Sequence, residues 1–227
     1  MNLTEHYNQL YTKSSEAILA GNYQLDSQIT NTSDSRFGIT LLIRPSEKIN
    51  NTIQLFLNDL KEVDAAQYYY PNSDIHITLL SIISCYEGFN LETIAVQDYV
   101  KIIQESLIDL PEIKIKFRGI TASPSAVMIQ GFPTDESLHT LRDKLRANFK
   151  KSTLQQSIDS RYSIATAHLT VVRFQEKLEN AEQVVTIMEK FRDYDFGEFI
   201  VDKIELVYND WYQRRENTKL LADFTIE

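Results

Sequence analysis

The sequence HITLL at residues 76–80 returns later in the chain as HLTVV at residues 168–172, and this repeat is the most informative feature of the sequence. Each copy lies in a longer apolar stretch, DIHITLLSII and TAHLTVVRF, and its many β-branched residues are typical of buried strands. Side chains of a strand alternate between its two faces, so each histidine points to the same side as the threonine two residues later. We therefore predict two strands that each carry one polar stripe. The stripes consist of His76 and Thr78 in the first copy and His168 and Thr170 in the second.

Helical and strand patterns alternate around these two stretches. Further strands are predicted over residues 37–45, 112–119, 125–132, 199–208 and 219–226. Helices are predicted over residues 3–20, 49–63, 91–110 and 180–194, and a fifth is expected to follow a cap at Thr134. About seven strands and five helices without strict βαβ alternation indicate an α+β fold.

The first 36 residues precede the predicted body of the protein. Gly21 follows the helix predicted over residues 3–20 and is expected to be its C-cap. The polar cluster NTSDS at residues 31–35 is typical of a loop. No linker rich in Pro, Gly or Ser interrupts residues 37–227. We predict one domain over residues 37–227 and an N-terminal helical extension over residues 1–36, packed on the body or hung from it.

Composition excludes several classes of protein. A chain of 227 residues with 43% hydrophobic residues is long enough for a large core, and its single cysteine, Cys85, excludes an internal disulfide. No apolar run approaches the ~18 residues of a membrane span, and the N-terminus does not resemble a signal peptide. The net charge of −9 argues against wrapping long duplex nucleic acid but allows a small anionic ligand in a local pocket. We predict a soluble, cytoplasmic monomer without membrane partners.

The paired motifs, on strands in the two halves of a chain of this length, resemble the two-histidine (2H) phosphoesterase superfamily. That family includes bacterial 2′-5′ RNA ligase-like proteins and cyclic nucleotide phosphodiesterases. The resemblance covers Phe37 to Glu227. It implies a bilobal α+β fold with pseudo-twofold symmetry, in which two antiparallel-rich sheets line a central cleft and the helices lie outside. Each lobe then supplies one His-x-Thr (HxT) motif to the cleft.

The family's second motif often carries a basic residue five positions after its histidine, and Arg173 stands at that place. Strand alternation puts Arg173 on the face opposite His168 unless a β-bulge intervenes. The resemblance thus suggests a substrate-binding role for Arg173 that regular strand geometry contradicts.

The four motif residues suit the cleavage of a phosphodiester. Histidine can act as general base or general acid because its ordinary pKa of about 6.5 is close to neutral pH. Each threonine hydroxyl can donate to a non-bridging phosphate oxygen, so neither a metal nor another cofactor is required. We predict hydrolysis or reversible ligation of cyclic or 2′-5′ phosphodiesters in small nucleotides or RNA ends. A module that binds a mononucleotide without turnover, and an interaction protein that uses its N-terminal helix, are the alternatives.

Aromatic residues are the remaining candidates for substrate binding. Tyr70, at the end of the run Tyr68–Tyr70, and Trp211, after the predicted strand ending near Tyr208, are candidates for stacking on a base. Both also fit ordinary roles in turns and loops.

Several charged or reactive residues are assigned no function. Cys85 is expected to be a buried thiol, and His6 and His139 are expected to lie on the surface of helices. A basic cluster on the helix after Thr134 is expected to form a solvated face. It consists of Arg142, Lys144, Arg146, Lys150 and Lys151.

Overall fold

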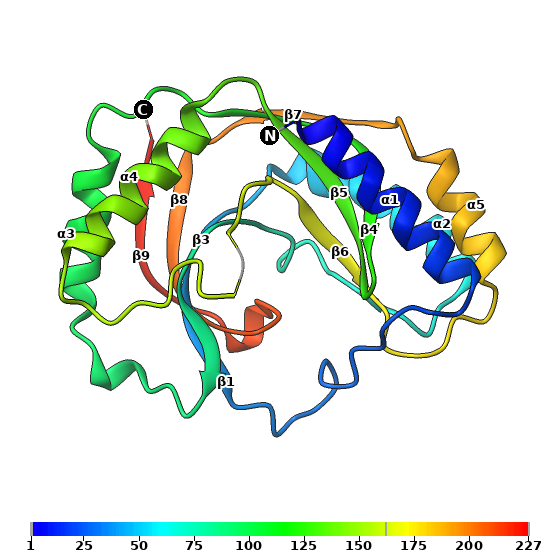
Figure 1. The fold of residues 1–227 in the computed structure, drawn as a ribbon, viewed down its shortest axis with the longest axis horizontal. Coiled ribbons are helices and arrows are strands. Elements are labelled where there is room, and N and C mark those ends of the chain that lie inside the picture. Colours follow the sequence, from blue (N-terminus) through cyan, green and yellow to red (C-terminus); the bar gives the residue numbers. More distant parts are fainter. Residues whose placement is uncertain (1, 162, 227) are drawn as a thin grey trace.

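The computed structural model describes residues 2–161 and 163–226, and it consists of two antiparallel sheets with helices packed against them (Figure 1). One sheet has four strands in the order β3-β1-β8-β9: β1 (Arg36–Ile43), β3 (Ile77–Glu87), β8 (Lys203–Asp210) and β9 (Lys219–Thr225). The other has five in the order β2-β6-β5-β4-β7: β2 (Tyr68–Tyr69), β4 (Lys114–Ser123), β5 (Ala126–Pro133), β6 (Leu169–Arg173) and β7 (Asp195–Ile200). The prediction of an α+β fold with two antiparallel sheets is confirmed.

Five α-helices and two short 3₁₀-helices complete the part of the chain that the structure describes. The α-helices are α1 (Leu3–Leu19), α2 (Glu47–Val63), α3 (Val96–Leu107), α4 (Ser137–Lys151) and α5 (Ala181–Lys190). The 3₁₀-helices are η1 (Leu91–Thr93) and η2 (Arg215–Asn217). Helices α3 and α4 lie together beside the four-stranded sheet, whereas α1, α2 and α5 lie beside the five-stranded one (Figure 1).

Helix α2 shows why these segments fold as they do. The Ser46 side chain caps the helix by accepting from the N–H of Ile49, which satisfies one of its free N-terminal amides. Its apolar side chains recur every three to four residues, so one face is buried in the core. The buried apolar residues are Ile49, Ile53, Phe56, Leu57 and Leu60.

The structure differs from the sequence prediction at several elements. Thr134 does not cap α4, because the helix begins only at Ser137 and Glu136 is its N-cap residue. The Thr134 N–H instead donates to the Lys114 carbonyl and continues the β4–β5 pairing. The helix predicted over 91–110 is divided into η1 and α3. The strand predicted over 199–208 is divided between β7 and β8, and β7 begins earlier, at Asp195. The edge strand β2 was not predicted, because two residues are too few to show an alternating pattern.

Helix α1 packs on the five-stranded sheet. The Tyr7 hydroxyl donates to the Gly131 carbonyl over 3.2 Å, and the Ser14 hydroxyl donates to the Ala122 carbonyl over 2.9 Å. At its other side, the Tyr11 hydroxyl donates to Glu189 of α5 over 2.6 Å. These contacts tie the N-terminal segment to the inner surface of the sheet and to α5. Among the described residues, no helix combines the length and the apolar composition needed to cross a membrane.

Gly131 of β5 has no room for a side chain. A Cβ atom there would overlap the carbonyl oxygen of Ala167, the residue directly before His168. Overpacking of a well-packed core typically costs about 1–3 kcal/mol. We expect Gly131→Ala to lower the free energy of unfolding by about this amount, measured by urea denaturation. Gly88→Ala provides a contrast, because its Cβ would meet open space and only its positive φ opposes the change; an equal loss in both variants would contradict the steric argument.

Candidate active site

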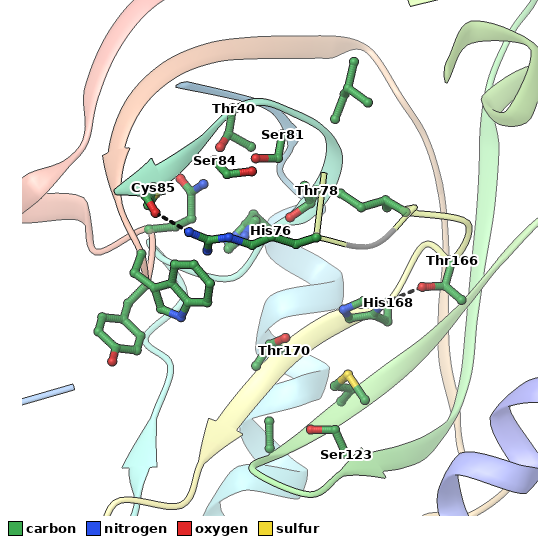
Figure 2. A pocket seen from close by; sticks show the side chains of 18 of the residues that line it. Thr40, His76, Thr78, Ser81, Ser84, Cys85, Ser123, Thr166, His168 and Thr170 are labelled. Carbon is green, nitrogen blue, oxygen red and sulfur yellow. Dashed lines mark hydrogen bonds between the residues drawn. The ribbon is translucent and has the colours of Figure 1, made fainter. Parts of the chain in front are cut away.

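A cleft of about 670 Å³ lies between the two sheets, and all four motif residues line it (Figure 2). His76 directly precedes β3 of the four-stranded sheet, and His168 directly precedes β6 of the five-stranded sheet. The cleft is also lined by residues of α1 and of the loop that joins α4 to β6. The two motifs, far apart in the chain, therefore meet at one hollow.

A β-bulge decides which side chains of β6 reach the cleft. Opposite β5, Thr170 pairs with Met128 and Val172 pairs with Val127, so Val171 is an extra residue in β6. The extra residue reverses the alternation after Thr170, and Arg173 returns to the side that faces the cleft. The expectation from regular strand geometry, that Arg173 lies on the opposite face, was wrong for this reason.

Strand β3 has a similar irregularity at the same place in its motif. Opposite β1, Thr78 pairs with Leu42 and Leu80 pairs with Leu41, which leaves Leu79 as the extra residue. Ser81 consequently lines the cleft five positions after His76, as Arg173 does five positions after His168. A second shift in register brings Ser84 to the same side. Each lobe thus has a bulge directly after its motif threonine. The residue that reaches the cleft five positions after the histidine is Ser81 in one lobe and Arg173 in the other.

Each imidazole is held at Nδ1 by the residue two positions earlier. His76 Nδ1 lies 2.7 Å from the Asp74 carbonyl oxygen, which can only accept, so Nδ1 carries the proton and Nε2 keeps its lone pair. His168 Nδ1 lies 2.7 Å from the Thr166 hydroxyl, drawn as a dashed line in Figure 2. These contacts fix both rings and leave the Nε2 atoms for a ligand.

Both imidazoles are neutral at pH 7 in the free protein. Burial in the cleft lowers the pKa of His76 to about 4, and the positive charges of Arg44 and Arg173 act in the same direction. Burial also lowers the pKa of His168 to about 4, with further lowering by His76, Arg142 and Arg173. Burial disfavours the charged form because water no longer solvates it. The same cleft would favour protonation once it holds an anion.

These low pKa values predict how stability depends on pH. The unfolded chain has the ordinary histidine pKa of 6.5, so between about pH 6.5 and 4 it binds more protons than the folded protein. Stability should therefore fall as the pH is lowered through this window, by an amount on the order of 1–3 kcal/mol for each ring. We expect urea midpoints of His76→Ala and His168→Ala to depend less on pH than those of the wild type. Parallel curves for all three proteins would contradict the low pKa values.

Arg173 is held from two sides within the cleft wall. Its Nε donates to the Tyr70 hydroxyl over 3.0 Å, and its Nη1 lies 3.3 Å from Oδ2 of Asp26. Asp26 also accepts from the Tyr212 hydroxyl over 2.7 Å. Asp26 belongs to the N-terminal segment, which sequence analysis treated as an extension.

The two aromatic candidates have different surroundings. Tyr70 lines the cleft but is only 2% exposed, so its hydroxyl contacts Arg173 while little of its ring is open to a ligand. Trp211 is half-buried at the cleft, and the guanidinium carbons of Arg161 and Arg36 lie 4.7 and 4.9 Å from its ring centroid. Of the two residues, Trp211 is the more exposed, and its ring already contacts two guanidinium groups.

Two further residues, His6 and Arg142, lie in other surroundings than the sequence predicts. His6 lines the cleft rather than the outer surface, because α1 packs on the inner face of the five-stranded sheet. Arg142 is buried, whereas the rest of its basic cluster is exposed or half-exposed. Its position, four residues after Leu138 and three before Leu145, was the available signal, since that spacing belongs to the apolar face of α4. Cys85 is buried as expected, and burial raises the pKa of its thiol to about 12.

Metal-ligating side chains are scattered. Within residues 2–161 and 163–226, no three His, Cys, Asp or Glu side chains are grouped so that they could hold a metal ion.

Comparison with known proteins identifies relatives of this fold. A family model described as the 2′-5′ RNA ligase superfamily matches residues 49–212. TT0787 of Thermus thermophilus superposes with a TM-score of 0.61 at 14% identity, covering 83% of this chain and 97% of its own. E. coli LigT, in its complex with 3′-AMP, gives a TM-score of 0.55 at 11% identity, with coverages of 84% and 98%. A search among curated proteins found no match.

A third similar structure covers more of the chain. ATU0111 of Agrobacterium tumefaciens, a conserved protein of unknown function, gives a TM-score of 0.56 at 14% identity over 92% of this chain and 98% of that one. Identities this low establish the fold alone. The family assignment comes from the matched residues 49–212, well over half of the sequence, and it agrees with the paired motifs. The chain belongs to the 2′-5′ RNA ligase superfamily of 2H phosphoesterases.

Proposed function

We propose that this protein is a metal-independent phosphoesterase that cleaves, or reversibly joins, cyclic or 2′-5′ phosphodiesters in small nucleotides or RNA ends. Family membership supports a 2H phosphoesterase or 2′-5′ RNA ligase-like activity in general terms. One observation carries the specific proposal: His76 and His168 come from different sheets, line one cleft and are both anchored at Nδ1.

In-line displacement at phosphorus needs a base on the attacking oxygen and an acid on the leaving oxygen. Imidazoles contributed by opposite walls can stand on the two sides of one phosphate, which two groups on one strand cannot easily do. The negative charge of the phosphate raises the imidazole pKa values in the complex, so that one ring can be protonated while the other stays neutral. For both rings to reach the reacting oxygens, we expect their Nε2 atoms to lie roughly 5–8 Å apart.

Thr78 and Thr170 are the proposed donors to the non-bridging oxygens. They face the cleft two residues after each histidine, where their hydroxyls can hold the phosphate and stabilise the charge that develops on it. Arg173 adds a positive charge on the same strand as Thr170.

The size and lining of the cleft suit a small substrate. A volume of about 670 Å³ is in the range of sites for single small ligands. A base could stack on Trp211 by displacing one of the guanidinium groups of Arg161 and Arg36 that lie over its ring, and these groups supply positive charge for a phosphate. LigT has been crystallised with 3′-AMP, ATP and NADP⁺, which fits a small-nucleotide partner here as well. The cytoplasmic location and the monomeric state stay predictions.

Turnover in the presence of a chelator tests this function. We expect the protein to convert 2′,3′-cyclic nucleotides to monophosphates in excess EDTA. Chromatography of the products measures this conversion. Binding of mononucleotides without turnover would favour the alternative of a non-catalytic module. The intact pair of histidines favours the enzyme, because binding alone does not require both.

A further inference from the structure

Arg142 is a buried cation without a carboxylate partner among the described residues. It lies on the apolar face of α4 and is 1% exposed. Within the part of the chain that the structure describes, its guanidinium donates to main-chain carbonyl oxygens alone. Nε donates to Leu79, and Nη2 donates to both Thr78 and Thr166, each over 2.9 Å. A buried charge is costly unless its hydrogen bonds are satisfied, so an aliphatic side chain would fill this position more simply.

The three carbonyls belong to the two motif segments. Thr78 and Leu79 lie in β3 of the four-stranded sheet, and Thr78 is the threonine of the first motif. Thr166 precedes β6 of the five-stranded sheet, and its hydroxyl holds Nδ1 of His168. One planar group therefore links both walls of the cleft, at the end of the first HxT motif and two residues before the second.

We propose that Arg142 is a positioning residue whose guanidinium sets the spacing between the two HxT segments and thereby the placement of His76 and His168 about one phosphorus atom. The kinetic consequence rests on the proposed phosphoesterase function, whereas the structural consequence does not. Small errors in the placement of reacting groups are expensive, since a displacement of about 1 Å can cost about 10²-fold in rate.

The charge of Arg142 has a second, separable effect. Charged and titratable groups acting on His168 are His76, Arg142, Arg173 and His6, and the Arg142 charge favours the neutral form of the ring. Loss of the charge should therefore raise the pKa of His168, whereas exchange for another cation should not. The planar set of guanidinium donors, by contrast, is lost in both replacements. A neutral side chain has no such donors, and lysine presents its donors from a single nitrogen.

Two substitutions separate charge from geometry. We expect Arg142→Lys to lower kcat on a 2′,3′-cyclic nucleotide about 10- to 100-fold with KM changed less than about threefold. Arg142→Met should lower kcat at least as much and also raise the pKa of His168, measured by ¹⁵N NMR of the imidazole. Leu145→Ala is the matched control on the same helix face: it removes buried apolar contacts and should lower Tm while kcat stays near the wild-type value.

The results distinguish this inference from the proposed function. If the wild type turns over substrate and Arg142→Lys keeps kcat within about threefold, with an unchanged His168 spectrum, the positioning role is refuted. If the wild type has no activity, the function fails, and a perturbed His168 Nδ1 resonance in Arg142→Lys still supports the linkage. If Arg142→Met does not fold, the kcat and the His168 spectrum of Arg142→Lys test the positioning role on their own.

Discussion

Replacement of His76 or His168 by alanine is expected to lower kcat by about 10²- to 10⁴-fold, the usual share of general acid–base catalysis. The loss should fall on kcat because, in the proposed mechanism, each ring exchanges its proton in the transition state rather than in the bound ground state. A variant lacking both rings should be little slower than either single variant, because acid and base act as one unit. Initial rates on a 2′,3′-cyclic nucleotide give these values directly.

His139→Ala is the control for this pair of substitutions. Its ring is exposed on α4, where it faces Asp143 across a 3.4 Å contact at the surface. It should keep full activity, and its Tm should match that of the wild type, since exposed ion pairs contribute little. Full activity in a correctly folded His76→Ala or His168→Ala variant would contradict the proposal that both histidines take part in catalysis.

The paired motif could be located from the sequence because strand alternation is a local property. A histidine and a threonine two residues apart share a face as long as no bulge falls between them, and both pairs indeed line the cleft. Arg173 and Ser81 could not be placed by the same rule. Their orientation depends on the extra residues Val171 and Leu79, and a bulge is set by pairing with a neighbouring strand rather than by the residues themselves.

Residues brought to the cleft by other elements were also beyond sequence analysis. Asp26 contacts Arg173 only because the segment after α1 runs beside β6, where the Asp26 N–H donates to the Phe174 carbonyl. His6 lines the cleft because its helix packs on the inner face of a sheet, whereas a helix pattern alone shows which side is apolar but not what covers it. Arg142 was predictable in part: its spacing placed it on the buried face, but its charge argued for the solvated one.

Loss of a motif threonine hydroxyl should be the next largest effect. We expect Thr78→Val and Thr170→Val each to lower kcat about 10²-fold, the usual cost of removing one preorganised donor to developing negative charge. Valine keeps the branched shape and strand propensity of threonine, so the loss reports the hydroxyl rather than the packing. Rates at saturating substrate measure the effect.

The location of the hydroxyls explains why kcat should fall less in the threonine variants than in the histidine variants. Two threonines, one from each lobe, can share the charge on the non-bridging oxygens, so removal of one leaves the other in place, whereas neither histidine can do the other's work. The Thr78→Val/Thr170→Val double variant should therefore lose more than either single variant, in contrast to the two histidines. Thr186→Val, at an exposed site on α5, should be silent. Equal rates in Thr78→Val, Thr170→Val and Thr186→Val would mean that the hydroxyls do not contact the phosphate, and the motif would then act through its histidines alone.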